Sequence, residues 1–202
     1  MFWLLGGFRA EGAGQVPRSG PRLIVSNHLS LADPFATFAA LPVAAWYMAE
    51  EELFGSRWST AILRFALTFP VNRGGADRRA LRRALQLLAA GEPLVVFAEG
   101  GIALSGRLEP LRPGAALLAL RSGAVVIPVG ISGTQRVLPP GGRRLRRAPG
   151  GVTVRIGAPL DLSEMPADLS RRERERWVTA RLSEAIAALL PEDQQPMPDE
   201  AG

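Results

Sequence analysis

The chain contains a single histidine, His28, and an aspartate follows it five residues later at Asp33. A histidine side chain accepts a proton near neutral pH. A carboxylate bonded to its other ring nitrogen fixes the tautomer and stabilises the protonated ring. A spacing of five suits such a pair if the chain turns between the two residues. The pair is therefore a candidate general base, although Asp33 before Pro34 also fits a helix cap and His28 fits an ordinary loop histidine.

Two further segments carry residue types that bind anions. Arg73 follows the apolar run 67–71 and precedes two glycines, and arginine in such a place suits a phosphate. Glu99 follows the apolar run 93–98 and is itself followed by Gly100 and Gly101, which permit close approach of the backbone. Taken singly, Arg73 also fits an ordinary ion pair, and Glu99 with its two glycines also fits a turn.

The composition excludes several kinds of chemistry. With no cysteine and one histidine in 202 residues, thiolate metal sites, cysteine nucleophiles and sites that need two histidines are excluded. All 24 cations are arginine, so a lysine Schiff base and a phosphate-loop lysine are excluded as well. No serine stands in a Gly-x-Ser-x-Gly segment, which leaves a serine hydrolase unsupported.

Strand-like and helix-like segments alternate along the chain, which predicts an α/β fold. We expect a single domain with a mixed, partly parallel sheet that helices flank. The carboxyl ends of its strands would then bring the three segments together. The expected strands are 22–26, 44–48, 67–71, 93–98, 124–131 and 152–156, and the expected helices are 34–41, 58–67, 77–90, 114–121 and one that begins at Ser170 with Glu173 in a capping box.

The two ends differ from the predicted domain of residues 9–190. Residues 1–8 are apolar but lack a basic leader, so we expect a cytoplasmic protein. This segment fits two interpretations: it rests in a lipid headgroup layer, or it packs on the surface of its own domain. Residues 191–202 combine three prolines with four acids and no base, which predicts a disordered tail.

The order of the motifs resembles the 1-acylglycerol-3-phosphate acyltransferase family of glycerolipid acyltransferases. The resemblance covers about residues 8–162 and implies the glycerolipid acyltransferase fold. The matching positions are His28 and Asp33 in the family's H-x-x-x-x-D motif, Arg73 in its second motif, Phe97, Glu99 and Gly100 in its F-P-E-G motif, and Ile127-Pro128-Val129 in its fourth motif.

The resemblance implies an acyltransferase, with acyl-CoA or acyl-carrier protein as donor and a lysophospholipid, first of all 1-acylglycerol-3-phosphate, as acceptor. His28 would deprotonate the acceptor hydroxyl and Asp33 would orient His28. The residues implied to bind substrate are Asn27, Arg73, Glu99, Gly100, Arg107 and Arg112. No metal and no cofactor is implied, because the acyl thioester is a co-substrate.

Departures from the family pattern leave the acceptor open. Ile102 stands where many members carry an arginine that contacts the phosphate, and Ala98 replaces the proline of the third motif. Another lysolipid, such as lysophosphatidylethanolamine or a lyso-amino-acid lipid, is therefore an alternative acceptor. A lipid-binding relative without catalytic activity is a second alternative.

Clustered arginines suggest an anionic membrane surface as a partner. One cluster lies within 78–83 and another within 136–147, and the chain has a net charge of +5. A solvated face explains them equally well. Nucleic acid is not expected, because no aromatic residues interleave with these arginines. We expect a peripheral protein on the inner face of the cell membrane.

Overall fold

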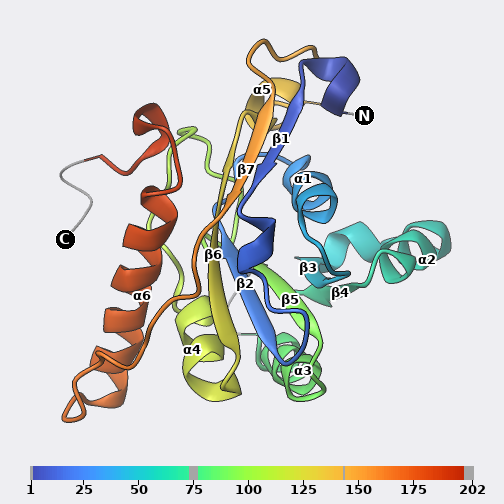
Figure 1. Ribbon diagram of the computed structural model, residues 1–202. Coiled ribbons are helices and arrows are strands. Elements are labelled where there is room, and N and C mark those ends of the chain that lie inside the picture. Colours follow the sequence, from blue (N-terminus) through green and yellow to red (C-terminus); the bar gives the residue numbers. More distant parts are fainter. Residues whose placement is uncertain (1, 73–76, 143, 198–202) are drawn as a thin grey trace.

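The computed structural model describes residues 2–72, 77–142 and 144–197, without the side chains of Trp3 and Leu4. Within these residues, the strands form one seven-stranded sheet in the order β1-β7-β6-β2-β5-β3-β4 (Figure 1). The strands are β1 (Phe8–Glu11), β2 (Arg22–Ser26), β3 (Trp46–Glu50), β4 (Thr68–Val71), β5 (Pro93–Phe97), β6 (Val125–Ser132) and β7 (Val152–Ile156).

The sheet is mixed and mostly parallel. The adjacent pairs from β6 through β2, β5 and β3 to β4 are parallel. β7 runs antiparallel to β6, and β1 runs parallel to β7. All five residues of β2 are buried, as expected for a central strand that is covered on both faces. This architecture confirms the predicted α/β fold with a single mixed sheet.

Helices cover both faces of the sheet and enclose two cores. On one face α1 packs through Ala36 and Ala40 against a cluster that includes Ile24 and Ile127. On the other face α3, α4 and α6 enclose a cluster that includes Leu88, Leu118 and Leu182. The α-helices are α1 (Asp33–Ala40), α2 (Arg57–Phe65), α3 (Arg78–Ala89), α4 (Pro113–Ser122), α5 (Thr134–Val137) and α6 (Arg171–Ala187), and short 3-10 turns lie at Phe2–Leu5 (η1), Ala13–Gln15 (η2), Glu51–Phe54 (η3) and Glu192–Gln194 (η4).

Two helix starts follow the capping residues expected from the sequence. Asp77 caps α3 by accepting the backbone N–H groups of Arg79 at 2.9 Å and Ala80 at 3.0 Å. The bond from Ala80, a further one from the backbone N–H of Asn72 and the bond from Arg79 lower the pKa of the Asp77 carboxyl. Ser170 and Glu173 form a capping box at the start of α6. Both caps confirm the predicted starts of these two helices.

The apolar N-terminal segment contributes to the domain's own core. Phe2 is only 6% exposed, and its ring stacks on Phe8 with the centroids 5.5 Å apart. Phe8 opens β1, a strand that was not expected and that pairs with β7. For Phe2, then, packing on the domain is the interpretation that the structure supports. In the described part of the chain no helix combines the length and the apolar character needed to cross a bilayer.

The start of the expected disordered tail is packed against the domain. Residues 192–194 form the turn η4, in which Gln194 is 2% exposed. Its carbonyl oxygen accepts the N–H of Leu108 at 2.9 Å, and the carbonyl of Gln195 accepts a bond from Arg107 Nη1 at 3.1 Å. Over residues 191–197 the structure therefore differs from the expected disordered tail. Hydrogen bonds to backbone carbonyls hold this segment, which has no hydrophobic anchor. Residues 198–202 lie outside the described part of the chain.

Candidate active site

The carboxyl ends of β2 and β5 position the catalytic candidates. In the parallel pair of β2 with β5, Ser26 lies opposite Phe97, so the residues that follow each strand emerge side by side. His28 and Glu99 thus leave neighbouring strands at the same edge of the sheet. Asp33 is the first residue of α1, the helix that follows the turn after His28. The chain therefore turns between His28 and Asp33, which is what a spacing of five residues requires if the two side chains are to meet.

His28 and Asp33 form a buried, hydrogen-bonded pair. His28 Nδ1 lies 2.8 Å from Asp33 Oδ2, and the two side chains are 6% and 0% exposed. Asp33 Oδ2 also accepts the backbone N–H groups of Leu29 at 2.6 Å and Ser30 at 2.8 Å. A carboxylate oxygen that accepts these bonds requires Nδ1 of the histidine to be the donor. This tautomer leaves the lone pair of Nε2 available to accept a proton.

His28 and the turn that follows it are also held by contacts that the sequence motif does not reveal. The ring of Phe97 stacks on His28, with centroids 4.2 Å apart and planes 18° from parallel. The carbonyl oxygen of His28 accepts the N–H of Ala103 at 2.7 Å. Ser30 Oγ donates to the carbonyl of Leu138 at 2.6 Å, which ties the turn to the loop after β6. Phe97 belongs to the third motif, but its stacking on His28 depends on the register of β2 with β5, which the motif does not contain.

Glu99 connects the third motif to the histidine. Its Oε2 accepts the backbone N–H of His28 at 2.5 Å, and its Oε1 accepts the N–H of Glu109 at 3.0 Å. The residue is 7% exposed. Its two carboxyl oxygens therefore hold the backbone on both sides of the site. Burial raises the pKa of Glu99 from 4.5 to about 8, against the lowering effect of the two N–H donors.

We predict that this buried carboxyl makes stability fall as pH rises. The folded protein binds the Glu99 proton more tightly than the unfolded chain, so its stabilising contribution is complete below pH 4.5 and is lost as pH rises through about 8. Glu99→Gln keeps the shape but has no such proton. As the pH rises across this range, the free energy of unfolding of the wild type should therefore decrease relative to that of Glu99→Gln. Urea titration of both proteins at each pH measures it. A difference that stays constant with pH would contradict the prediction.

Of the remaining expected site residues, Asn27 and Arg112 lie close to His28 or Glu99, Arg107 points elsewhere, and Arg73 is not described by the structure. Asn27 is fully buried, and its amide exchanges two hydrogen bonds with the backbone of Ile131 on β6, at 3.0 and 2.8 Å. Arg112 donates from Nε to the carbonyl of Glu99 at 3.2 Å and so lies beside Glu99, whereas the guanidinium of Arg107 donates to the carbonyl of Gln195, just after η4. Arg73 lies outside the described residues. The structure thus gathers His28, Asp33, Asn27, Glu99, Gly100 and Arg112, but not Arg107.

Gly100 is required by both its conformation and its neighbour. Its φ is +70°, and a Cβ built on it would lie 2.5 Å from Arg112 Cδ. Gly106 offers a matched control, because its φ is +75° and a Cβ there would meet nothing within 4 Å. Alanine at either position carries a left-handed backbone cost of about 1–2 kcal/mol.

We predict that Gly100→Ala destabilises the protein more than Gly106→Ala does. The additional cost arises because Arg112 must move, which breaks its bond to the Glu99 carbonyl. Chemical denaturation of the two variants measures the difference. Equal losses of stability would mean that Arg112 moves aside without cost.

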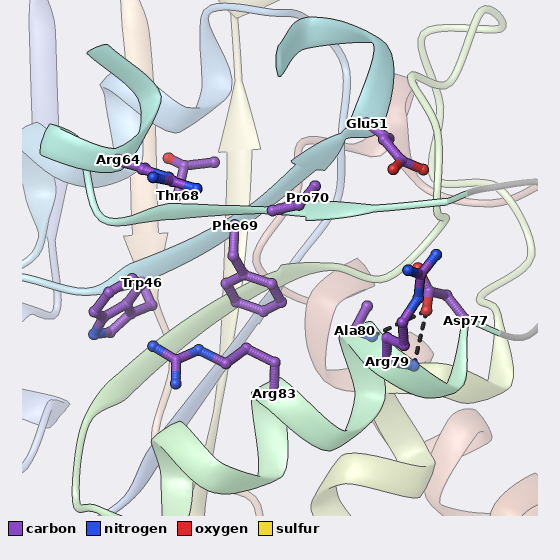
Figure 2. Close-up of a pocket in the computed structure, with 10 residues that line it drawn as sticks. All are labelled: Trp46, Glu51, Arg64, Thr68, Phe69, Pro70, Asp77, Arg79, Ala80 and Arg83. Atoms are coloured by element: carbon purple, nitrogen blue, oxygen red, sulfur yellow. Dashed lines mark hydrogen bonds between the residues drawn. The ribbon is translucent and has the colours of Figure 1, made fainter. Parts of the chain in front are cut away.

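A pocket of about 540 Å³ lies apart from this group, between α3 and the strands β3 and β4 (Figure 2). In it the guanidinium of Arg83 lies 5.5 Å from the ring centroid of Trp46. The residues that line the pocket are Trp46, Glu51, Arg64, Thr68, Phe69, Pro70, Asp77, Arg79, Ala80 and Arg83. None of them belongs to the His28 group, that is, His28, Asp33, Asn27, Glu99, Gly100 and Arg112.

Residues 2–72, 77–142 and 144–197 hold no cluster of three or more metal-ligating side chains.

The comparison with known proteins agrees with the motifs. The chain is 27% identical to the 1-acyl-sn-glycerol-3-phosphate acyltransferase of Bacillus subtilis over 187 residues, which cover 92% of this chain and 89% of that protein. It is 25% identical to Tafazzin of Drosophila melanogaster, where the match covers 89% of this chain and 52% of that protein.

A solved structure shares the fold. The crystal structure of the 1-acyl-sn-glycerophosphate acyltransferase PlsC from Thermotoga maritima superimposes with a TM-score of 0.71 at 26% identity, covering 93% of this chain and 73% of that one. Residues 7–132, which contain the His28–Asp33 pair and Glu99, match the Acyltransferase family. The resemblance inferred from the motifs is thereby confirmed, and the chain belongs to the Acyltransferase family.

Proposed function

We propose that the protein transfers a fatty acyl group from acyl-CoA or acyl-carrier protein to the hydroxyl of a lysophospholipid, first of all 1-acylglycerol-3-phosphate. The observation that carries the proposal is the bond of His28 Nδ1 to a carboxylate oxygen that also accepts two backbone N–H groups. This arrangement prepares Nε2 as a base. The relatives named 1-acyl-sn-glycerol-3-phosphate acyltransferase support the choice of acceptor.

The proposed reaction needs one proton acceptor and no covalent enzyme intermediate. His28 Nε2 takes the proton of the acceptor hydroxyl as the oxygen attacks the carbonyl carbon of the thioester. The new C–O bond forms, the C–S bond breaks, and the leaving thiolate takes the proton from the imidazolium. The products are an ester and a free thiol. Asp33 holds the ring and stabilises its transient positive charge throughout.

We propose a division of labour among the other motif residues. Asn27 and Glu99 act as positioning residues, since their polar atoms are engaged by backbone groups of Ile131, His28 and Glu109. The outer nitrogens of Arg112, which bonds the Glu99 carbonyl through Nε, supply a cation for an anionic acceptor. Arg73 is proposed as a further phosphate ligand on the strength of its motif alone.

A different acceptor is favoured by one observation. Ile102, at the position where the family pattern has a phosphate-binding arginine, is half-buried in the loop after Glu99 and supplies no charge. A lysolipid without a terminal phosphate monoester, such as lysophosphatidylethanolamine or a lyso-amino-acid lipid, would need no arginine there. We propose the cytoplasmic membrane surface as the place of reaction, because the acceptor is a lipid.

An acyl-transfer assay with a panel of acceptors tests the proposal. Each thioester donor is combined with lysophosphatidate, lysophosphatidylethanolamine and a phosphate-free lysolipid, and free thiol and ester product are measured together. Transfer to lysophosphatidate above the others supports the first acceptor, and preference for another lysolipid supports the second. A folded protein that transfers to none of them would instead be a lipid-binding relative without catalysis.

A further inference from the structure

The helix α2 turns its apolar side to solvent. None of its nine residues is buried, and Trp58, Ile62 and Phe65 are 83%, 66% and 93% exposed. Spacings of four and three place these side chains on one face of the helix. An amphipathic helix normally turns such a stripe to the core. Figure 1 shows α2 projecting from the body of the domain, so this apolar stripe has no partner among the described residues.

The outer side of α1 repeats the pattern. Phe35 and Phe38 are 62% and 69% exposed, and Leu31, just before the helix, is 51% exposed. Their spacings are again four and three, while Ala36 and Ala40 face the core. The crossovers from β2 through α1 to β3 and from β3 through α2 to β4 advance in the same direction across the sheet. Right-handed connections therefore place both helices on the same face.

The arginines on α2 and in the loop after β6 would complement an anionic lipid surface. α2 contains Arg57 and Arg64 and no acid, although Glu51 and Glu52 in η3 precede it. The loop after β6, which Ser30 ties to the catalytic turn, exposes a further group of arginines. Large apolar side chains with arginines at their edge and a tryptophan among them are typical of helices that lie in a membrane interface. The loop arginines are Arg144, Arg146 and Arg147.

We propose that the exposed faces of α1 and α2 form a bilayer-docking surface, with the arginines at the level of the lipid headgroups. The proposal rests on the proposed function, because a lipid acceptor resides in a bilayer. α1 begins at Asp33, so docking through α1 brings the bilayer to the helix that carries the catalytic carboxylate. The buried Phe2 of the N-terminal segment is not available for the same contact.

Vesicle sedimentation of the full chain tests the proposal. The probes are vesicles of phosphatidylcholine and vesicles of phosphatidylcholine with phosphatidylglycerol, without donor or acceptor. The variant combines Trp58→Ser, Ile62→Ser and Phe65→Ser, and we expect its partitioning to be weaker by at least about tenfold. The control combines Val125→Ser and Met197→Ser, which are 37% and 49% exposed and belong to neither helix. It should bind vesicles like the wild type.

Two results would overturn the docking surface. One is equal sedimentation of the α2 variant and the wild type. The other is a wild type that light scattering shows to be a dimer and the α2 variant a monomer, with no difference in vesicle binding, because a second copy of the chain would then cover α2. Equal binding to neutral and anionic vesicles would overturn the part assigned to the arginines.

Acyl transfer to a detergent-dispersed acceptor separates this proposal from the proposed function. The α2 residues lie outside the His28 group, so the α2 variant should keep the wild-type rate in detergent while it loses vesicle binding. If neither protein transfers acyl groups but only the wild type binds vesicles, the proposed function fails and the docking surface stands. If both transfer acyl groups and both bind vesicles equally, the docking surface fails and the function stands.

Discussion

His28→Asn is expected to lower the rate of acyl transfer by about 10²–10⁴-fold, the usual contribution of a positioned general base. An asparagine side chain can still donate to Asp33 Oδ2, as Nδ1 of His28 does at 2.8 Å. The three hydrogen bonds around that oxygen can therefore persist. What the variant lacks is a second nitrogen that accepts a proton at the position of Nε2.

His28→Ala provides a comparison with a different structural cost. Removing the ring leaves Phe97 without the partner stacked 4.2 Å away and opens a cavity in a site that is 5% exposed. We therefore expect this variant to lose both activity and stability, with a loss of about 2–4 kcal/mol by analogy with other large-to-small changes. Thioester turnover and urea denaturation of the two variants separate the base from the packing. An asparagine variant with more than about a third of wild-type activity would remove His28 from the role of base.

The parallel part of the fold follows closely from local patterns. The middle residues of β2, β5 and β6 are mostly β-branched and other apolar residues, as expected for strands whose two faces are both buried. The caps at Asp77 and Ser170 are side-chain chemistry that can be read locally. A sheet with sites at the carboxyl ends of its strands was therefore predictable from these segments.

Elements that depend on distant backbone partners were not predictable in this way. β1 has the burial pattern of a half-exposed edge strand, and only its pairing with β7, more than 140 residues later, makes it a strand. The turn at residues 192–194 lacks a hydrophobic anchor. The carbonyl of Gln194 accepts the N–H of Leu108, and the carbonyl of the next residue, Gln195, accepts the side-chain Nη1 of Arg107. Local hydrophobicity contains no information on either partnership.

The candidate site likewise combines a feature that the local sequence predicts with contacts that depend on distant partners. The pairing of His28 with Asp33 requires only a turn of five residues, and the motif reveals it. The engagement of Glu99 with the N–H of His28, and of Asn27 with Ile131, depends on the register of β2 with β5 and β6. Residue types alone therefore do not show that the side chains of Asn27 and Glu99 are bonded to backbone groups.

Two substitutions of Asp33 separate the contribution of this residue to the reaction from its contribution to the stability of the fold. Asp33→Asn can retain a carbonyl oxygen at the position of Oδ2, with its three donors. Its amide nitrogen would then occupy the position of Oδ1, which is buried without a hydrogen-bond partner among the described residues. An unsatisfied buried donor costs about 1–3 kcal/mol. Without the negative charge the imidazolium is less stable, so acyl transfer should fall by at least about 100-fold.

Asp33→Ala should instead affect the fold. It removes the acceptor of Leu29 N–H and Ser30 N–H, both in residues that are 0% exposed, and it leaves His28 Nδ1 without its partner. At about 1–3 kcal/mol for each unsatisfied donor, the free energy of unfolding should fall well below that of Asp33→Asn. Urea denaturation and acyl transfer, measured on both variants, give the two effects separately. If both variants were equally stable and only activity were lost, Asp33 would act on the reaction alone, and the turn from β2 into α1 would need another source of support.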